Sequence, residues 1–414
     1  MGAAGTLLRA AQRALGWKGG GMLLGGKRVF PITLSGGPPM GTKDSVTGSD
    51  GWTEVAQAGV TMLRVYPHWD AATAAQQIND MKTQLAAAEQ KGLRLWVGLY
   101  NVANDLSKQA LLEQIVSGLK DSPGLGAWKG ADEPLWGSLD PAGLAAAHDF
   151  IRSLDPNHPV VIIQAPKAPA KPKLLGKPLT LAPLKPYAAA GDIQGVDIYP
   201  ISYPPGVHAG RPNTDISVVG DVTALVVQAA PAAEHWTTLQ IAWSGILPSK
   251  GNIPIFPTLR QERFMAYQAI IAGAQGLVFF GGDLVEVADP NDKSAGWNWA
   301  FWHSVLKRVV QELTSDSVGP ALVAPPAPFK VKANASDVRL VARKAGRFLY
   351  LIVVRRNPRA NGPVRFTGLP QSIKFGAAMF EYAGKDFRTF RVSRGSFTDP
   401  FAPHDARVYR FRLG

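Results

Sequence analysis

Residues 124–137 have the sequence GLGAWKGADEPLWG, an apolar run of strand length that ends in two carboxylates, a proline and a tryptophan. Because proline has no backbone N–H and cannot continue a central strand, the strand should end at Glu133. A carboxyl group at the end of a buried strand, with an indole close by, is placed to keep its proton near neutral pH. This stretch alone allows two interpretations. Glu133 is an acid–base group, or it caps a helix or forms a salt bridge in a strand–helix loop.

Similar apolar runs recur on both sides of this stretch and alternate with segments of helical period from residue 27 to about residue 313. One such segment places Leu112, Ile115, Val116 and Leu119 on a single helical face. Eight strand–helix units in roughly 290 residues are typical of a (β/α)₈ barrel, an α/β fold. The predicted strands are residues 29–34, 61–66, 93–99, 126–130, 160–164, 193–198, 238–242 and 277–280.

The main alternative is a doubly wound open sheet, which would place a glycine-rich phosphate-binding turn after its first strand. The turn found there, Gly36-Gly37-Pro38-Pro39, lacks that pattern. We therefore expect a closed TIM barrel.

The pattern changes after about residue 317. Residues 320–328 are rich in proline and alanine, as in a linker, and short strand-like runs separated by turns follow. These runs are residues 338–343, 347–354, 364–367, 377–382, 387–392 and 406–411. We expect a small all-β sandwich at 320–414, after a barrel at 27–315 and a basic N-terminal extension at 1–26.

Composition excludes several classes of function. The chain has 414 residues, of which 46% are hydrophobic, and no apolar run is long enough to span a membrane. It has no cysteine, and its seven histidines show no spacing typical of a metal site, so we expect no metal and no cofactor. The net charge of +13 is spread along the chain without a nucleic-acid-binding signature, so we expect no nucleic-acid partner.

Two basic segments stand out. Residues 7–17 read as a short basic amphipathic helix, which fits a membrane-surface or partner-docking helix or, as we prefer, a loosely ordered extension. The segment from Pro166 to Pro186 holds six prolines, five lysines and no acidic residue. Because proline stiffens the backbone, this segment is either a rim that contacts an anionic polymer or a surface insertion kept soluble by lysine.

The C-terminal ends of the strands form the catalytic mouth of such a barrel. Carboxylates and amides bind sugar hydroxyls, and aromatic rings stack on sugar faces. The residues that the sequence places at the mouth, counting nearby loops, are Arg64, His68, Trp69, Asp70, Asn101, Asp132, Glu133, Trp136, Asp197, Tyr199, Gln240, Trp243, Asp283 and Trp297. They predict a carbohydrate substrate.

These residues resemble those of the clan A glycoside hydrolases. In that clan, Asn-Glu-Pro or Asp-Glu-Pro at the end of strand four carries the acid/base, which corresponds to Glu133 here. Arg64 is similar to the arginine near the clan's nucleophile, and Tyr199 to its strand-six tyrosine. Residues 397–410 resemble the closing strand of the β-domains often attached to these barrels. The resemblance implies a glycoside hydrolase.

One departure concerns the nucleophile, which in this clan is a glutamate at the end of strand seven. Here residues 240–245 read QIAWSG, and the nearest acid, Glu234, precedes the predicted strand. A different carboxylate can act, with Asp283 our first choice, then Asp197, then Asp70. The reaction can instead invert, with one of these as base at roughly 6.5–9.5 Å from Glu133. The third possibility is a non-hydrolytic glycan-binding barrel, and a different barrel hydrolase or lyase is the remaining alternative.

Overall fold

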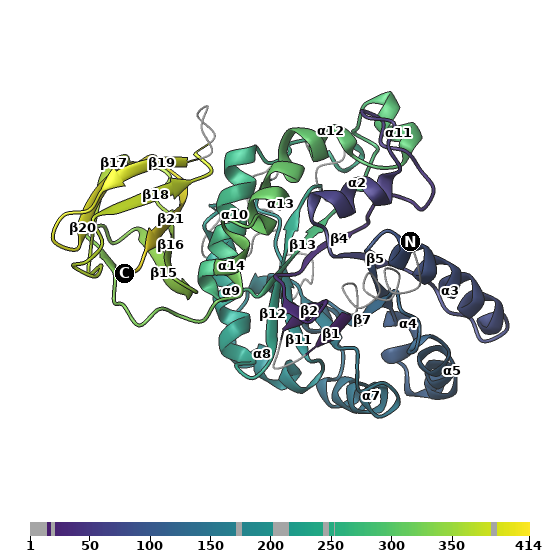
Figure 1. Cartoon of the computed structure of the whole chain (residues 1–414). Helices are drawn as coiled ribbons and strands as arrows, with labels where there is room; N and C mark the ends of the chain where they lie inside the picture. The colour runs from purple at the N-terminus through teal and green to yellow at the C-terminus, as the bar shows by residue number, and fades with distance from the viewer. Residues whose placement is uncertain are drawn as a thin grey trace, which may run out of the picture.

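Eight parallel strands close into a barrel in this computed structural model, which describes residues 15–17, 21–170, 176–201, 215–242, 248–251, 253–381 and 387–414 (Figure 1). The barrel strands are β4 (Ile32–Ser35), β5 (Met62–Val65), β6 (Arg94–Gly98), β7 (Leu125–Asp132), β8 (Val160–Gln164), β11 (Ile193–Asp197), β12 (Glu234–Gln240) and β13 (Gly276–Phe280). Each strand pairs in parallel with its neighbours, and β13 pairs with β4 to close the ring. The predicted barrel is confirmed.

Helices surround the barrel because each carries one apolar face. On α3, for example, the buried residues Ile78, Met81, Leu85 and Ala88 recur every three or four positions. The longer helices are α2 (Gly51–Ala58), α3 (Ala74–Gln90), α5 (Gln109–Leu119), α7 (Pro141–Leu154), α9 (Val218–Ala229), α10 (Leu259–Ala272) and α13 (Lys307–Thr314). The shorter ones are α4 (Tyr100–Ala103), η1 (Leu106–Lys108), α6 (Pro134–Gly137), α8 (Leu181–Leu184), η3 (Lys185–Ala189), η5 (Pro248–Lys250), α11 (Pro290–Ala295), α12 (Trp299–Phe301), η6 (Trp302–Leu306) and α14 (Gly319–Leu322). No helix in the described ranges is long and apolar enough to cross a bilayer.

A small antiparallel sheet covers the N-terminal end of the barrel. It consists of β1 (Leu15–Trp17), β2 (Met22–Leu24) and β3 (Lys27–Arg28). Met22 and Trp17 pack against Trp96 and Trp236 inside the barrel, and the Trp17 indole donates to Gly126 O at 3.1 Å. The expectation of a helix over residues 7–17 is wrong for residues 15–17, which pair with β2 as a strand and place the half-buried Trp17 against the N-terminal end of the barrel. Residues 1–14 lie outside the described residues.

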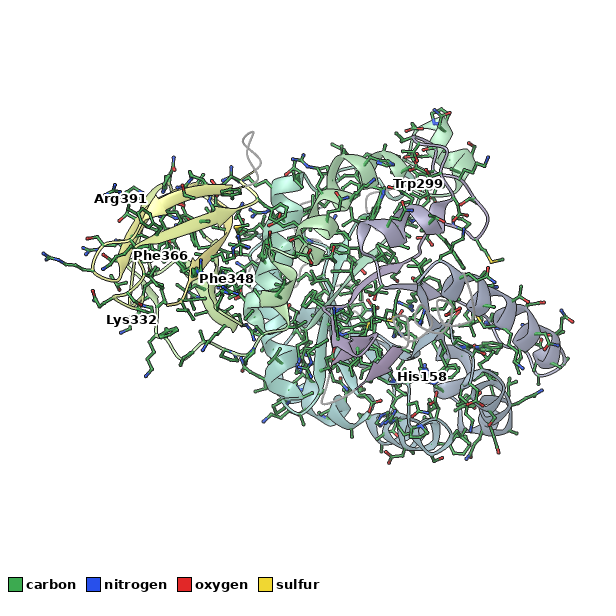
Figure 2. The ribbon with its side chains drawn as sticks, viewed as in Figure 1. His158, Trp299, Lys332, Phe348, Phe366 and Arg391 are labelled. Carbon is green, nitrogen blue, oxygen red and sulfur yellow. The ribbon has the colours of Figure 1, made fainter. Side chains whose placement is uncertain are left out.

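The C-terminal region is a β-sandwich, as predicted. One sheet contains β14 (Lys332–Ala333), β17 (Gly362–Thr367) and β20 (Ser396–Phe401). The other contains β15 (Val338–Ala345), β16 (Phe348–Arg355), β18 (Phe375–Met379), β19 (Phe387–Arg391) and β21 (Ala406–Arg412). Phe366 lies in the core between the sheets, whereas Phe348 lies on the side that faces the barrel (Figure 2). The sequence patterns missed β14, and residues 397–410, expected as one closing strand, are divided between β20 and β21 in the two sheets.

The sandwich packs on α10 and α13 through a buried ion pair. Arg263 of α10 contacts Glu312 of α13 at 2.8 Å and also donates to the backbone oxygen of Ala406 in β21. Tyr267 donates its hydroxyl to the same Glu312 at 2.7 Å. The two domains therefore share a polar contact that is shielded from water.

Candidate active site

Strand β7 ends in an irregular backbone that places Glu133 at the mouth of the barrel. The register between β7 and β8 shifts between Lys129 and Asp132, which is the mark of a bulge. Glu133 follows with φ of 46°, in the left-handed region that is unfavourable for a side chain with a Cβ, and its N–H donates to Ile163 O at 2.7 Å. Pro134 then opens α6. Strain of this kind is concentrated at functional sites, which favours the acid–base interpretation of Glu133 over the capping one.

Asp197, the last residue of β11, meets Glu133 across the mouth. The two carboxyl groups are hydrogen-bonded to each other, and the Tyr199 hydroxyl bonds to Asp197 as well. Asp197 is 8% exposed, and its Oδ1 has no hydrogen-bond partner among the described residues. Burial and the adjacent Glu133 raise the pKa of Asp197, and burial raises that of Glu133. Two carboxyls in contact cannot both ionise readily, so the pair retains a proton well above the ordinary carboxyl range.

Asp132 lies beside this pair and is held by two cations. Arg64 Nη2 contacts Asp132 Oδ2 at 3.0 Å, and Lys129 Nζ contacts Asp132 Oδ1 at 3.0 Å. The two cations outweigh the effect of burial and hold the pKa of Asp132 well below its usual range. The Arg64 guanidinium also lies over the rings of Tyr66, at 4.4 Å, and Trp96, at 5.2 Å. Asp132 therefore stays ionised, with its side chain half-exposed at the mouth of the barrel.

Lys129, Tyr66 and Ser35 are site residues that the sequence analysis missed. Lys129 is fully buried, and burial lowers its pKa to about 8. The Tyr66 hydroxyl bonds to Ser35 Oγ at the ends of β5 and β4. A signal for Lys129 was present in the sequence, because a lysine at an inward-facing position of an otherwise apolar strand needs a buried partner.

Asp283 and Asp70, the other two candidates for the second carboxylate, have different surroundings. Asp283 packs against Gly36, where an added Cβ would lie 2.2 Å from its Oδ1. It borders a groove of about 390 Å³ that Arg64 and Tyr66 also line. Asp70 is exposed and accepts from Ala72 N in its own turn. Of these three carboxylates, Asp197 is the one in contact with Glu133, so our order of preference changes.

Two amides predicted at the mouth hold the backbone instead. Gln240 is fully buried, and its side chain donates to Ile201 O and accepts from Ile201 N, at 2.7 and 2.8 Å. Asn101 accepts from Trp69 N and donates to Trp69 O, at 3.3 and 2.8 Å. These bonds fix the segments after β11 and β5.

The burial of two tryptophans corrects the expectation that their rings are open at the mouth. Trp69 donates its indole N–H to Gly98 O at 2.7 Å, and Trp297 donates to Gly36 O at 2.8 Å. Both are at most 2% exposed, because a backbone acceptor lets the whole indole enter the core. His68 is exposed. Trp243 lies outside the described residues.

Trp136 is partly exposed on α6, the short helix that begins directly after Glu133. The lysine- and proline-rich segment packs beside it, since an added Cβ at Gly176 would lie 3.2 Å from the Trp136 ring. Within this segment, β9 (Lys167–Ala168) and β10 (Lys177–Pro178) form a short antiparallel hairpin, and residues 171–175 lie outside the described residues. The basic segment therefore reaches the edge of the mouth.

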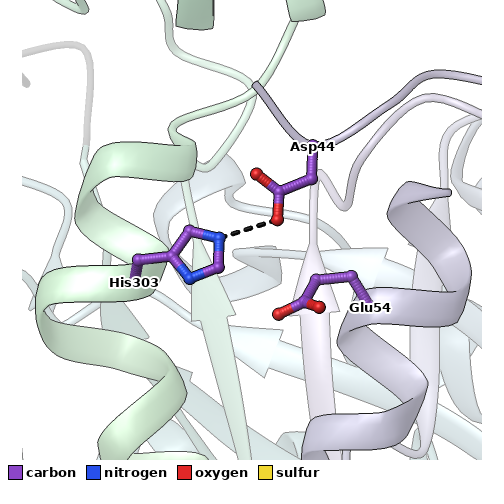
Figure 3. Close-up of side chains that lie close together, drawn as sticks. All are labelled: Asp44, Glu54 and His303. Carbon is purple, nitrogen blue, oxygen red and sulfur yellow. Dashed lines mark hydrogen bonds and ion pairs between the residues drawn. The ribbon is translucent and has the colours of Figure 1, made fainter. Parts of the chain in front are cut away.

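One group of described side chains has metal-ligand spacing, but its members already bond to one another and to neighbouring side chains. The donor atoms of Asp44, Glu54 and His303 lie within 4.8 Å of one another (Figure 3). His303 Nε2 bonds to Asp44 Oδ2 at 2.7 Å, while Lys307 Nζ contacts Glu54 Oε1 at 2.6 Å. The Lys307 ammonium on Glu54 would repel a metal cation bound to this group. The contacts of the group connect the first and the last strand–helix units of the barrel.

Known structures share the fold of this chain. A family 5 glycoside hydrolase from Bacteroides vulgatus is 15% identical, with a TM-score of 0.63 over 97% of this chain and 94% of that one. A protein described as a glycoside hydrolase is 13% identical, with a TM-score of 0.59 over 97% of both chains. An α-amylase from Geobacillus thermoleovorans is 11% identical, with a TM-score of 0.52 over 93% of this chain and 99% of that one.

The likeness is one of fold, and glycoside hydrolases of several families share it. No protein-family model matches the sequence, and no curated protein is similar to it at a significant level.

Proposed function

We propose that this protein is a glycoside hydrolase that cleaves the glycosidic bonds of an oligo- or polysaccharide. The observation that carries the proposal is the hydrogen-bonded pair of Glu133 and Asp197 at the C-terminal ends of β7 and β11. Glycoside cleavage needs two carboxyls, one protonated and one ionised, and a pair that shares one proton supplies both forms. The barrel fold shared with known glycoside hydrolases supports the same reading.

In this mechanism Glu133 is the general acid and Asp197 the nucleophile. An Asp197 oxygen forms a bond to the anomeric carbon while the glycosidic C–O bond breaks, and the Glu133 proton passes to the departing oxygen. Glu133 then takes a proton from a water molecule, whose oxygen displaces Asp197 and releases the sugar. Contact between the two carboxyls fits the roughly 5–5.5 Å spacing typical of retention better than the roughly 6.5–9.5 Å spacing typical of inversion. We therefore infer retention, with the pair separating as the sugar enters.

The alternative is a barrel that binds glycans without cleaving them. The lack of a carboxylate at the C-terminal end of β12, where residues 240–245 read QIAWSG, favours it, since Gln240 is buried and committed to the Ile201 backbone. The deciding experiment is a screen of aryl glycosides and polysaccharides with the wild type and Glu133→Gln in parallel. Hydrolysis by the wild type that the variant loses supports the hydrolase. Binding without hydrolysis by both proteins supports the alternative.

The shared proton predicts a pH profile. Glu133 and Asp197 must hold one proton between them, so activity should fall as the pH rises through the raised pKa of the pair, where that proton is lost. Activity should also fall at low pH, where both carboxyls are protonated. We expect kcat/KM to be bell-shaped, with an alkaline limb clearly above the ordinary glutamate pKa of about 4.3. An alkaline limb that persists in Glu133→Gln would contradict this assignment.

Replacing Trp136 should have a modest effect on glycan binding. Its partly exposed ring beside Glu133 is placed to stack on a sugar, so Trp136→Ala should weaken glycan binding by about 1 kcal/mol. Isothermal titration with a bound oligosaccharide measures this change. Phe375→Ala is the matched control, because Phe375 is an exposed ring of the sandwich at 62% exposure. Equal binding by the wild type and Trp136→Ala would remove the ring from the binding surface.

A further inference from the structure

We propose that Lys129 is a positioning residue that sets how the Glu133–Asp197 pair holds its proton, through its contacts to the end of β7 and to Asp132. Its importance for catalysis rests on the proposed function, whereas its effect on the pair can be measured without a substrate.

Lys129 occupies an unusual location for a lysine, because it is fully buried inside the barrel. Its side chain is 0% exposed and lies on the same face of β7 as Ala127, which packs with Trp96 inside the barrel. Burying an ammonium group costs several kcal/mol unless a partner compensates it, so lysine is rarely found fully buried. A methionine or leucine would fill such a position at lower cost. The charge itself is therefore the feature to explain.

Two contacts of Lys129 act on the backbone and side chain directly before Glu133. Its Nζ donates to the backbone oxygen of Ala131, inside the bulge, and contacts Asp132 Oδ1 at 3.0 Å. The backbone that Lys129 holds therefore leads straight into Glu133 and its left-handed φ of 46°. Arg64 reaches the other oxygen of Asp132 from β5.

The charges around the pair come from four sides of the mouth. Strand β7 supplies Lys129 and Asp132, and β5 supplies Arg64. Three further titratable groups follow the ends of strands: Tyr66 after β5, Tyr199 after β11 and Asp283 after β13. Lys129 and Arg64 together exceed the charge of Asp132 by one positive unit. Lys129 interacts electrostatically with both Glu133 and Asp197 and favours their ionised forms. Without it, Arg64 and Asp132 would cancel, and the pair would retain its protons to higher pH.

The test is a carboxyl titration of the substrate-free protein by ¹³C NMR, with the Asp197 and Glu133 signals assigned from Asp197→Asn and Glu133→Gln. We expect Lys129→Met to raise both pKa values of the pair by about one unit. The double variant Lys129→Met/Asp132→Asn removes one charge of each sign and should return the values to near those of the wild type. Lys120→Met is the matched control, since Lys120 donates to the backbone oxygen of Leu154, the last residue of α7.

Unchanged pKa values in folded Lys129→Met would overturn the proposal and leave Lys129 with a packing role only. If Lys129→Met does not fold, Asp132→Asn and the double variant carry the test. Asp132→Asn should lower both pKa values relative to the wild type, and the double variant should lie above Asp132→Asn. Equal values in those two proteins would overturn the proposal. Because no substrate enters the measurement, either result is independent of whether the protein proves to be a hydrolase.

Discussion

Replacing Glu133 with glutamine should lower the turnover of an alkyl glycoside or a polysaccharide by at least about a hundredfold, the usual contribution of a general acid. Glutamine has the same shape and can keep a hydrogen bond to Asp197, so the barrel should stay folded. Its amide cannot give a proton to the departing oxygen. The loss in kcat/KM should be much smaller for a dinitrophenyl glycoside, because that leaving group departs without protonation.

The measurement is kcat/KM, which reports the step in which the leaving group departs, for both substrates in the wild type and in Glu133→Gln, with circular dichroism to confirm the fold. Glu286→Gln is the matched control, because Glu286 is an exposed glutamate in the loop that follows β13, on the same side of the barrel. Full activity of Glu133→Gln on the alkyl glycoside would remove Glu133 from the mechanism. An equal loss with both leaving groups would assign it a role other than proton donation.

Replacing Asp197 with asparagine should have the larger effect, a loss of at least about a thousandfold that does not depend on the leaving group. An amide cannot form the glycosyl ester, and the loss of either residue leaves the other without its partner. The double variant should therefore lose little more than Asp197→Asn alone, because residues that act as a unit are not additive.

Asp283→Asn distinguishes Asp197 from the carboxylate that the sequence ranked first. Asp283 packs on Gly36 and borders the groove beside Tyr66, and Asp197 is the candidate bonded to Glu133. We expect Asp283→Asn to lose no more than about tenfold, the scale of one or two hydrogen bonds. If Asp283→Asn were inactive and Asp197→Asn active, the roles that we assign to the two residues would be exchanged.

Much of the fold could be read from local patterns. Alternating apolar runs and helical segments predicted the eight strands, and proline at position 134 predicted the end of β7. Such features depend on neighbours within a few positions, since side-chain period and turn residues act locally. The errors came where pairing depends on distant partners. Strand β12 begins at Glu234 rather than residue 238, and Leu15–Trp17 form a strand because they pair with β2.

The candidate site depended on contacts that no local pattern contains. The sequence named Glu133, Asp132 and Asp197 as mouth residues, because a barrel brings the ends of its strands together. Which carboxyl meets Glu133 depends on the bulge in β7 and on how Asp197 emerges from β11, two strands away in the barrel. Likewise, Gly98 O and Gly36 O accept from the indoles of Trp69 and Trp297 and draw them into the core, and the Ile201 backbone engages Gln240. Lys129 and Asp132 are only three positions apart, but Arg64 reaches Asp132 from β5, and a pairing of that kind forms when distant strands close into one ring.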